Sequence, residues 1–206
     1  MNPRQFWDER FGSKSYAYGS EPNDFLRLQA GALTPGDALC LAEGEGRNAV
    51  YLASLGHRVV AQDLSPVGLR KAQQLAASRG VAIHCECYDL QSFDPQANSF
   101  DLVVAIWMHL EPSLRAQVHR RAIKALRPGG RLILEAYRPE QLEFGTGGPP
   151  ALELLISPEQ LRAELSGLEL QTLESTTRLI SEGPYHQGMS AVAQAVGRKP
   201  QDQPTD

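Results

Sequence analysis

Short apolar runs alternate with segments of helical character along most of the chain. Phe100–Ile106 is an unbroken apolar run, which is typical of a central parallel strand covered on both faces. Strands are expected over 38–42, 58–62, 81–87, 100–106 and 131–137, and helices over 49–55, 66–78 and 112–126. The helix over 112–126 is expected to carry its Arg and His residues on its outer face. This alternation predicts a doubly wound, Rossmann-like α/β sheet.

The pattern changes near the end of the chain. After a capped helix start at Ser157–Gln160, residues 168–179 and 189–196 alternate between apolar and polar side chains. The short turn 181–188 joins these two segments, so they must run antiparallel. We therefore predict a seven-stranded, mostly parallel sheet with an antiparallel last strand.

The two ends of the chain are expected to lie outside this sheet. The first residues are predicted to form a helix over 3–11, then a polar loop and a second helix that begins near Pro22. We divide the chain into an N-terminal helical lid over 1–35, one ligand-binding domain over 36–197 and a polar, disordered tail over 198–206.

Composition limits the partners and the compartment. A chain of 206 residues that is 42% hydrophobic and 21% charged is an ordinary globular domain, and its net charge of −4 gives no reason to expect nucleic acid or an anionic membrane as a partner. No run reaches the roughly 20 apolar residues of a membrane helix, and the N-terminus is not a signal peptide, so we expect a cytoplasmic protein. Cys40, Cys85 and Cys87 are expected to be reduced, and no metal site is expected.

A glycine-containing turn follows the first expected strand. Gly44 and Gly46 would let a ligand approach the backbone, and Asp63 ends the next strand about 20 residues later. An acid at that point of a strand–turn–helix–strand unit can hydrogen-bond both hydroxyls of a ribose. Because Gly44-x-Gly46-x-x-Ala49 also matches the dinucleotide fingerprint, NAD is one candidate ligand.

The charges beside the turn argue against a dinucleotide. Glu43 and Glu45 flank the turn, where a pyrophosphate needs N–H donors and no nearby anions. An antiparallel last strand also does not fit a dinucleotide dehydrogenase. The two carboxylates suit a ligand that brings positive charge, such as S-adenosylmethionine, which has a ribose, an ammonium and a sulfonium but no phosphate. The alternative is that both are solvated loop residues.

The chain resembles the class I S-adenosylmethionine-dependent methyltransferases over about residues 36–197, through the glycine-containing turn and the turn Leu126–Gly130. Within that superfamily, the tripeptide Gly46-Arg47-Asn48 and the opening segment Trp7–Asn23 resemble the tellurite-resistance and thiol (thiopurine-type) methyltransferase branch. The resemblance implies S-adenosyl-L-methionine as cofactor and a small-molecule substrate.

The sequence departs from this family at two positions. Cys40 and Ala42 stand where the family has an acid and a glycine, so Glu43 or Glu45 is expected to position the methionine ammonium instead. Asp89 is expected to accept a hydrogen bond from the adenine amine, although a simple turn role is the alternative. The resemblance implies these cofactor-binding residues: Glu43, Gly44, Glu45, Gly46, Asn48, Asp63, Leu64, Asp89, Leu90 and Ile106.

The substrate side is predicted from the loops at the strand ends. Trp107–Leu110 is not the Asn/Asp-Pro-Pro-Tyr tip of the amino-methylating families, which argues against a protein, DNA-base or amide-nitrogen substrate. The candidate catalytic residues are His186, His109 and Arg138, as cations for an anionic nucleophile or, for a histidine, as a proton acceptor. The candidate substrate contacts are Trp7, Tyr16, Tyr18, Trp107 and Tyr185, and packing roles are the alternative. The loop 138–150 is predicted to be a mobile flap.

These observations predict a methyltransferase that acts on a small soft nucleophile, namely a thiol, selenium or tellurium species. Two alternatives remain: an O- or N-methyltransferase of a small metabolite, and a module that binds S-adenosylmethionine without turnover. The sequence leaves the acceptor and the oligomeric state open.

Overall fold

One seven-stranded sheet organises the molecule, and the computed structural model describes residues 2–201. The strand order is β3-β2-β1-β4-β5-β7-β6. The strands are β1 (Asp37–Cys40), β2 (Arg58–Asp63), β3 (His84–Cys87), β4 (Phe100–Ile106), β5 (Leu126–Tyr137), β6 (Glu169–Ser181) and β7 (Gln187–Arg198). The β7 strand is antiparallel to both neighbours and the other pairs are parallel, so the predicted sheet is confirmed.

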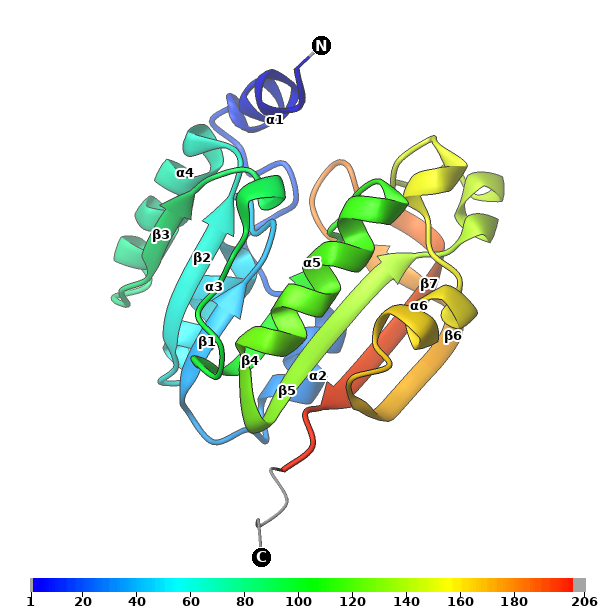
Figure 1. Ribbon diagram of the computed structural model, residues 1–206. Coiled ribbons are helices and arrows are strands. Elements are labelled where there is room, and N and C mark those ends of the chain that lie inside the picture. The colour runs from blue at the N-terminus through cyan, green and yellow to red at the C-terminus, as the bar shows by residue number, and fades with distance from the viewer. Residues whose placement is uncertain (1, 202–206) are drawn as a thin grey trace, which may run out of the picture.

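Helices cover both faces of the sheet. They are α1 (Pro3–Phe11), α2 (Asp24–Ala30), α3 (Arg47–Ser54), α4 (Pro66–Ser78), α5 (Pro112–Ala125) and α6 (Pro158–Glu164), with short 3-10 turns η1 (Leu90–Ser92), η2 (Pro139–Glu143) and η3 (Leu152–Leu154). Apolar side chains of α2, α3 and α4 pack on one face, and those of α5 and α6 pack on the other. Figure 1 shows α5 in front of the sheet, α2 behind it, and α1 at the end where β2 points.

The central strand β4 shows why the apolar pattern predicts this arrangement. Leu102 and Val104 pack into the layer with α2 and α3, whereas Val103 and Ala105 pack into the layer with α5. A strand buried on both faces needs an unbroken apolar sequence. The helix starts also follow local signals, since the Ser65 hydroxyl accepts the Gly68 N–H at 3.1 Å.

Several boundaries differ from the expected ones. The helix α2 begins after Asn23, whose side chain accepts the Leu26 N–H, so Pro22 lies outside it. The β3 strand is shorter than predicted and begins only at His84. The predicted tail begins too early, because Arg198 still belongs to β7 and the next residue, Lys199, donates its N–H to Gly130. The rest of that predicted tail, residues 202–206, lies outside the described residues.

The prediction that the Arg and His residues of α5 face outward was wrong for two of them. Arg115 and His119 are each 2% exposed and turn toward α6. Glu164 explains the burial, since it accepts from the Arg115 guanidinium at 3.0 Å and lies 2.7 Å from Nδ1 of His119. Glu164 of α6, an acid distant in sequence, thus holds Arg115 and His119 of α5 in a contact between the two helices.

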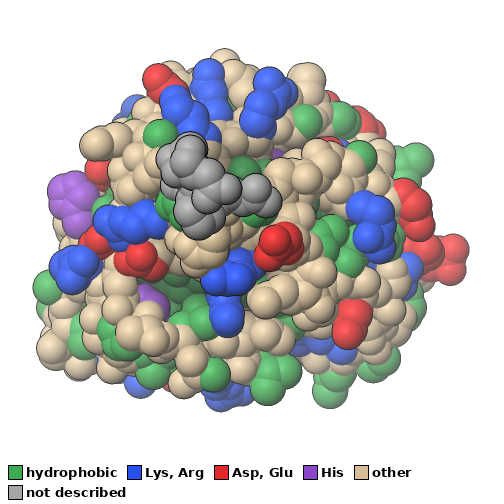
Figure 2. All heavy atoms as spheres, turned by 60° about the horizontal axis from the view of Figure 1, so that its bottom comes forward, with side chains coloured by type: hydrophobic (Ala, Val, Ile, Leu, Met, Phe, Trp, Pro, Cys, Tyr) green, Lys and Arg blue, Asp and Glu red, His purple; other side chains and the backbone are tan. Residues whose placement is uncertain are grey.

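Charges of both signs are mixed at the end of the molecule opposite α1. There Arg127 pairs with Asp37 at 2.8 Å and with Asp101 at 2.6 Å. Figure 2, turned to bring this end forward, shows blue and red side chains interspersed. In residues 2–201, no helix is long and apolar enough to cross a membrane, no group of three or more His, Cys, Asp or Glu residues could hold a metal ion, and the three cysteines are free.

Candidate functional site

The candidate site lies at the carboxyl edge of the parallel strands. Adjacent strands β1, β2, β3 and β4 run in parallel register, so the segments that follow them meet at this edge. Glu43, Asp63, Asp89 and Trp107 stand at these four ends. Ligands of open α/β sheets bind in the crevice outside these ends.

The turn after β1 is tied to the acid at the end of β2. Gly44 and Gly46 are left-handed, with φ of +61° and +90°. The Gly44 N–H donates to Oδ2 of Asp63 at 2.8 Å, and the Ser65 N–H donates to Oδ1 at 2.8 Å. A Cβ on Gly46 would lie 2.4 Å from the Cβ of Ala72. Gly46 therefore lets α4 pack against the turn, while Gly44 fixes the orientation of the acid.

Glu43 occupies the place where a dinucleotide would put its pyrophosphate. Its Oε1 accepts the N–H of Asn48 at 2.9 Å and that of Ala49 at 2.8 Å, at the start of α3. Such N–H groups at a helix N-terminus are the donors that bind phosphate in dinucleotide sites. A carboxylate already satisfies them here, which argues against NAD.

Glu43, which is half-buried, and Asp63, which is buried, form no ion pair with residues 2–201. Burial raises the pKa of Glu43 to about 7 and that of Asp63 to about 6. A nearby cation would favour the charged forms of both. These residues therefore fit a ligand with positive charge and hydroxyls, and S-adenosylmethionine has both.

Three of the predicted cofactor residues, Glu45, Asn48 and Gly46, make contacts that join the turn to other segments. Glu45 is 4% exposed, pairs with the Lys71 ammonium and accepts the Ala17 N–H at 2.7 Å. The Asn48 side chain accepts the Asn23 N–H at 2.9 Å. Together with Gly46, which is packed on α4, these residues hold the N-terminal segment and the turn in place.

The remaining predicted cofactor residues line the same edge. Asp89 caps η1, where its Oδ1 accepts the Gln91 N–H at 2.8 Å, so the alternative turn role is present. Leu90 and Ile106 are buried, and Leu64 is half-buried. Their contact with an adenosine remains a prediction.

Five rings form an aromatic cage beyond the ends of β4 and β5: Trp107, His109, Tyr137, His186 and Tyr18. The Trp107 and Tyr137 rings stack with centroids 4.3 Å apart, and His109 stacks on Tyr137 at 5.5 Å. His186 lies 5.3 Å from Trp107, and Tyr18 covers His186 at 4.5 Å. The cage thus gathers β4, β5, the β6–β7 hairpin and the N-terminal loop.

Trp107 has a strained backbone at the tip of β4. Its φ is +59°, a left-handed conformation that bulky residues rarely adopt. Its N–H donates to the carbonyl of Glu135 at 2.9 Å, and its indole Nε1 donates to Glu182 at 2.7 Å. Strain of this kind persists where the surroundings hold it, and it concentrates at functional sites.

The cage contains polar atoms that lack hydrogen-bond partners among residues 2–201. These are both ring nitrogens of His109, the Tyr137 hydroxyl and Nδ1 of His186. Burial, and then the nearby His186, lower the pKa of His109 to about 3. Burial likewise lowers the pKa of His186, so both rings are neutral near pH 7. Such a site favours a ligand that can exchange hydrogen bonds with neutral imidazoles.

Some of the predicted substrate contacts lie at this cage, and the others pack elsewhere in the N-terminal segment. Of the predicted substrate contacts, Tyr18 and Trp107 belong to the cage, and Tyr185 borders it, 6.0 Å from Tyr18. Trp7 instead stacks on Phe11 at 5.5 Å. Tyr16 lies under the Lys71 ammonium, 4.8 Å from its ring centroid.

Arg138 stands apart from the two histidines. It follows Tyr137, and strand alternation directs consecutive side chains to opposite faces of the sheet. Its guanidinium pairs with Glu140 at 3.1 Å, although its Nε has no partner within residues 2–201. Its catalytic role therefore remains a prediction without a contact to the cage.

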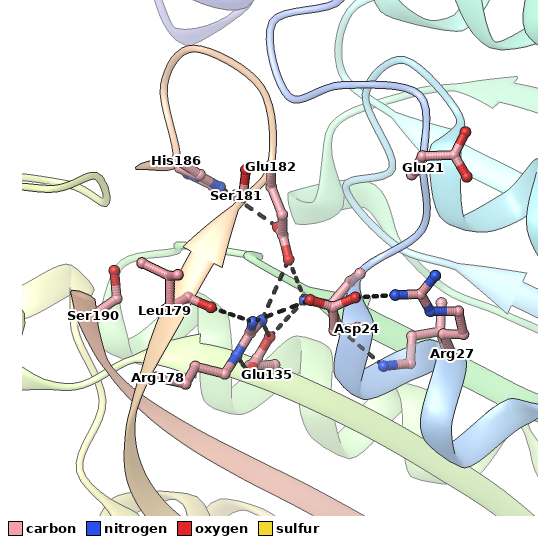
Figure 3. Close-up of polar contacts among 12 residues, drawn as sticks. Glu21, Asp24, Arg27, Glu135, Arg178, Leu179, Ser181, Glu182, His186 and Ser190 are labelled. Carbon is pink, nitrogen blue, oxygen red and sulfur yellow. Dashed lines mark hydrogen bonds and ion pairs between the residues drawn. The ribbon is translucent and has the colours of Figure 1, made fainter. Parts of the chain in front are cut away.

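A buried charged network beside the cage was not predicted. Glu135 is 0% exposed and accepts from the Arg178 guanidinium at 2.6 and 2.8 Å, while Glu182 accepts from Arg47 at 2.6 Å. Figure 3 shows Glu135, Arg178 and Glu182 pointing toward one another below the hairpin that carries His186. The one sequence signal was an acid, Glu135, inside the apolar strand Arg131–Tyr137.

Comparison with known proteins gives one family match, over part of the chain. Residues 38–130 match the family described as "Methyltransferase domain". No curated protein sequence matches the chain.

Several solved structures share the fold. A structure of N-methyltransferase NodS from Bradyrhizobium japonicum WM9 in complex with S-adenosyl-l-homocysteine has a TM-score of 0.72 at 18% identity, covering 98% of this chain and 100% of that chain. TehB from Haemophilus influenzae has a TM-score of 0.72 at 16% identity, covering 95% and 66% of the two chains. A protein studied for "Conversion of a Disulfide Bond into a Thioacetal Group during Echinomycin Biosynthesis" has a TM-score of 0.76 at 19% identity, covering 97% and 91%.

Proposed function

We propose that the chain is a class I methyltransferase that uses S-adenosylmethionine and that it methylates a small soft nucleophile, with a neutral thiol favoured. Within the class of thiol, selenium and tellurium acceptors, the charge of the cage separates the candidates. An oxyanion would need a nearby cation to remain bound in a buried site. Of the cations beside the cage, Arg47 and Arg178 are already paired with Glu182. Arg10 donates to the Tyr18 hydroxyl at 3.2 Å and lies over the Tyr185 ring.

The single observation that carries the proposal is the pair of neutral, unpaired histidines inside the aromatic cage. A neutral imidazole can accept a proton from the attacking group as that group becomes a nucleophile. His186 is the better proton acceptor, because burial and the nearby His186 hold the pKa of His109 at about 3. Thiols fit this base best, since their pKa of about 8.5 lies nearer to that of imidazole than the pKa of a phenol at about 10.

The other residues of the site hold the reactants and exclude water. When bound, S-adenosylmethionine supplies an electrophilic methyl group on its sulfonium sulfur. Glu43 would hold its ammonium and Asp63 its ribose hydroxyls. The rings of Trp107, Tyr137 and Tyr18 would surround the acceptor and keep water from the reacting atoms, which matters because water stabilises separated charges.

The proposed chemistry also agrees with the sulfur chemistry named for one structural neighbour. That protein was studied for the conversion of a disulfide bond into a thioacetal group. At 19% identity this likeness adds a precedent for the fold and no residue assignment.

A labelled-methyl assay tests the acceptor class. Thiols, phenols and amines on the same carbon skeletons are offered with labelled S-adenosylmethionine, and the thiols should react fastest. Faster phenols or amines would favour an O- or N-methyltransferase. Tight cofactor binding by calorimetry with no labelled product from any acceptor would favour the module without turnover.

The variant His186→Ala tests the base. It should lower turnover by about 10²- to 10⁴-fold, the usual contribution of a general base, and leave cofactor affinity nearly unchanged. Calorimetry gives the affinity and the labelled-methyl assay gives the rate. Equal losses of affinity and rate would contradict a substrate-side role, as would an unchanged rate.

A further inference from the structure

We propose that Glu182, on the β6–β7 hairpin, is a positioning residue that holds Trp107 and His186 in the aromatic cage while the N-terminal segment is closed. The inference rests on the proposed function, because it concerns the base and the wall of the same acceptor site. Glu182 acts through these two side chains and has no predicted contact with either reactant.

One carboxylate joins five segments of the chain. Oε2 of Glu182 accepts from Trp107 at 2.7 Å and from Arg47 of α3 at 2.6 Å. Oε1 accepts from Asn23 of the N-terminal segment at 2.9 Å and from Arg178 of β6 at 3.3 Å. Four donors from four other segments thus converge on a side chain of the hairpin turn that is 5% exposed.

Closure of the N-terminal segment completes this set of contacts. Asn23 is 0% exposed and its side-chain amide bridges Glu182 and Glu135. At the tip of the hairpin, a Cβ on Gly183 would lie 2.5 Å from the Gly19 nitrogen, so the two backbones are in direct contact. Displacement of this segment would remove one donor from Glu182 and the Tyr18 ring from His186.

Glu182 also holds the strained tip of β4. The hydrogen bond to the indole fixes the Trp107 ring, which stacks on Tyr137. Without that bond, the left-handed backbone of Trp107 loses one of the contacts that maintain it. The wall of the acceptor site would then be free to take other orientations.

His186 lies close enough to benefit from the same charge. Its Nδ1 is 3.9 Å from Oε2 of Glu182, which exceeds hydrogen-bonding distance, so a small shift would join them once the ring gains a proton. The other charged or titratable groups facing His186 are Arg47, Arg10, His109, Tyr18 and Tyr137. None of these five groups is a carboxylate. The carboxylate of Glu182 therefore favours the imidazolium that the proposed reaction forms on His186.

Two charge-removing substitutions separate positioning from packing. Glu182→Gln keeps the shape of the side chain, and Glu135→Gln is the matched control. Glu135 is equally buried and shares the partners Arg178 and Asn23, but its side chain contacts neither His186 nor the Trp107 indole. Glu182→Gln should lower kcat about 10- to 100-fold, the range seen when an orienting partner is lost, with cofactor affinity little changed.

The pH profile gives the readout that a packing role would not move. Because Glu182 raises the pKa of His186, its neutralisation should shift the acid limb of the rate profile to lower pH. Glu135→Gln should leave that limb in place. Equal limbs in wild type and Glu182→Gln, or equal shifts in both variants, would overturn the inference.

A nuclear magnetic resonance signal tests the contact without any activity. The chain has two tryptophans, so Trp7→Phe leaves the Trp107 indole N–H as a single resonance. This resonance should move, and exchange faster with solvent, in Glu182→Gln but not in Glu135→Gln. An unmoved resonance would overturn the inference. If Glu182→Gln does not fold, Glu182→Asp, which keeps the charge but retracts it, should give the same faster exchange.

The outcomes also separate this inference from the proposed function. An unchanged rate in His186→Ala would reject His186 as the base and leave the indole result intact. A moved indole with an unshifted acid limb would reject the link between Glu182 and His186, while thiol methylation could still be observed.

Discussion

Glu43 stands between the helix α3, which it caps, and the place where a cationic ligand would lie. Both of its hydrogen bonds go to Oε1, and burial raises its pKa to about 7. Glu45, two residues later, is neutralised by Lys71. Of the two acids expected to replace the family's missing carboxylate, Glu43 is therefore the one with unbalanced charge.

We predict that Glu43→Gln weakens binding of S-adenosylmethionine and of S-adenosylhomocysteine by about 1.5–3 kcal/mol each, the value of a hydrogen bond to a charged group. Both ligands carry the ammonium. A glutamine oxygen can still cap α3, so the fold should persist. Calorimetry measures the affinities, and methylthioadenosine, which lacks the ammonium, is the control whose binding should not change. A loss for all three ligands would point to a distorted turn.

At the residue scale, spacing predicted positions better than partners. The spacing from Gly44 to Asp63 located an acid at the carboxyl edge of the sheet, because the strand–turn–helix–strand unit has a nearly fixed length. It did not reveal that Glu45 turns toward Lys71, or that Glu164 buries Arg115 and His119. Those pairings join residues far apart in sequence, so one sequence offers no local signal for them.

At the scale of elements, the N-terminal segment is held down by one side chain of α4. The Lys71 ammonium donates to the carbonyls of Ser13 at 2.9 Å and Ser15 at 2.7 Å and pairs with Glu45. Nearby, Phe11 covers the turn, where a Cβ on Gly44 would lie 3.0 Å from its ring. We therefore expect that a ligand at Gly44 and Asp63 exchanges with solvent when this segment moves.

Lys71→Ala should speed release of S-adenosylhomocysteine about tenfold or more, since losing even one net contact of about 1.4 kcal/mol has that effect if release requires opening. Lys14→Ala is the matched control, because Lys14 lies in the same segment and is exposed. Stopped-flow displacement measures the rates, and limited proteolysis of residues 12–16 should quicken in parallel. Identical release rates in the two variants would mean that the segment does not limit exchange.

Element boundaries were predictable where a capping signal marks them. Ser65-Pro66 and Ser157-Pro158 start α4 and α6 at the expected residues, because each serine caps and each proline suits the first turn. The start of β3 was predicted too early. Val81 and Ile83 are apolar because they pack against α4 residues, and strand pairing begins only at His84.

At the scale of the whole molecule, the alternation of strands and helices predicted the sheet and the edge that carries the site. The cage was less predictable, because its rings come from the N-terminal loop, β4, β5 and the β6–β7 hairpin. These segments meet only through the strand order β4-β5-β7-β6. The sequence indicated His109 and His186 as candidates because of the loops that carry them. It did not predict that their rings contact the same aromatic side chains.

The two acids Glu43 and Asp63 link the stability of the whole molecule to pH. In the ligand-free protein the pKa of Glu43 is raised from 4.5 to about 7 and that of Asp63 from 3.8 to about 6. An acid whose pKa is raised by folding binds its proton more tightly in the native state. Its contribution to stability is complete below its unfolded pKa and is lost as pH rises through the folded value. The free energy of unfolding should therefore fall as pH rises from about 4 to 7, because these two groups ionise over that range.

A cationic ligand should reverse this penalty, because it stabilises the same acids in their charged form. Binding of S-adenosylmethionine at pH 6 should therefore release protons, and the release should fade toward pH 8, where both acids are already ionised. Calorimetric titrations at pH 6 in buffers of different ionisation enthalpy measure the release directly. The Glu43→Gln variant should lose the part that Glu43 contributes. Equal binding heats in all buffers at pH 6 would show that the ligand's positive charge does not lie against these carboxylates, and the assignment of the cofactor edge would then have to move.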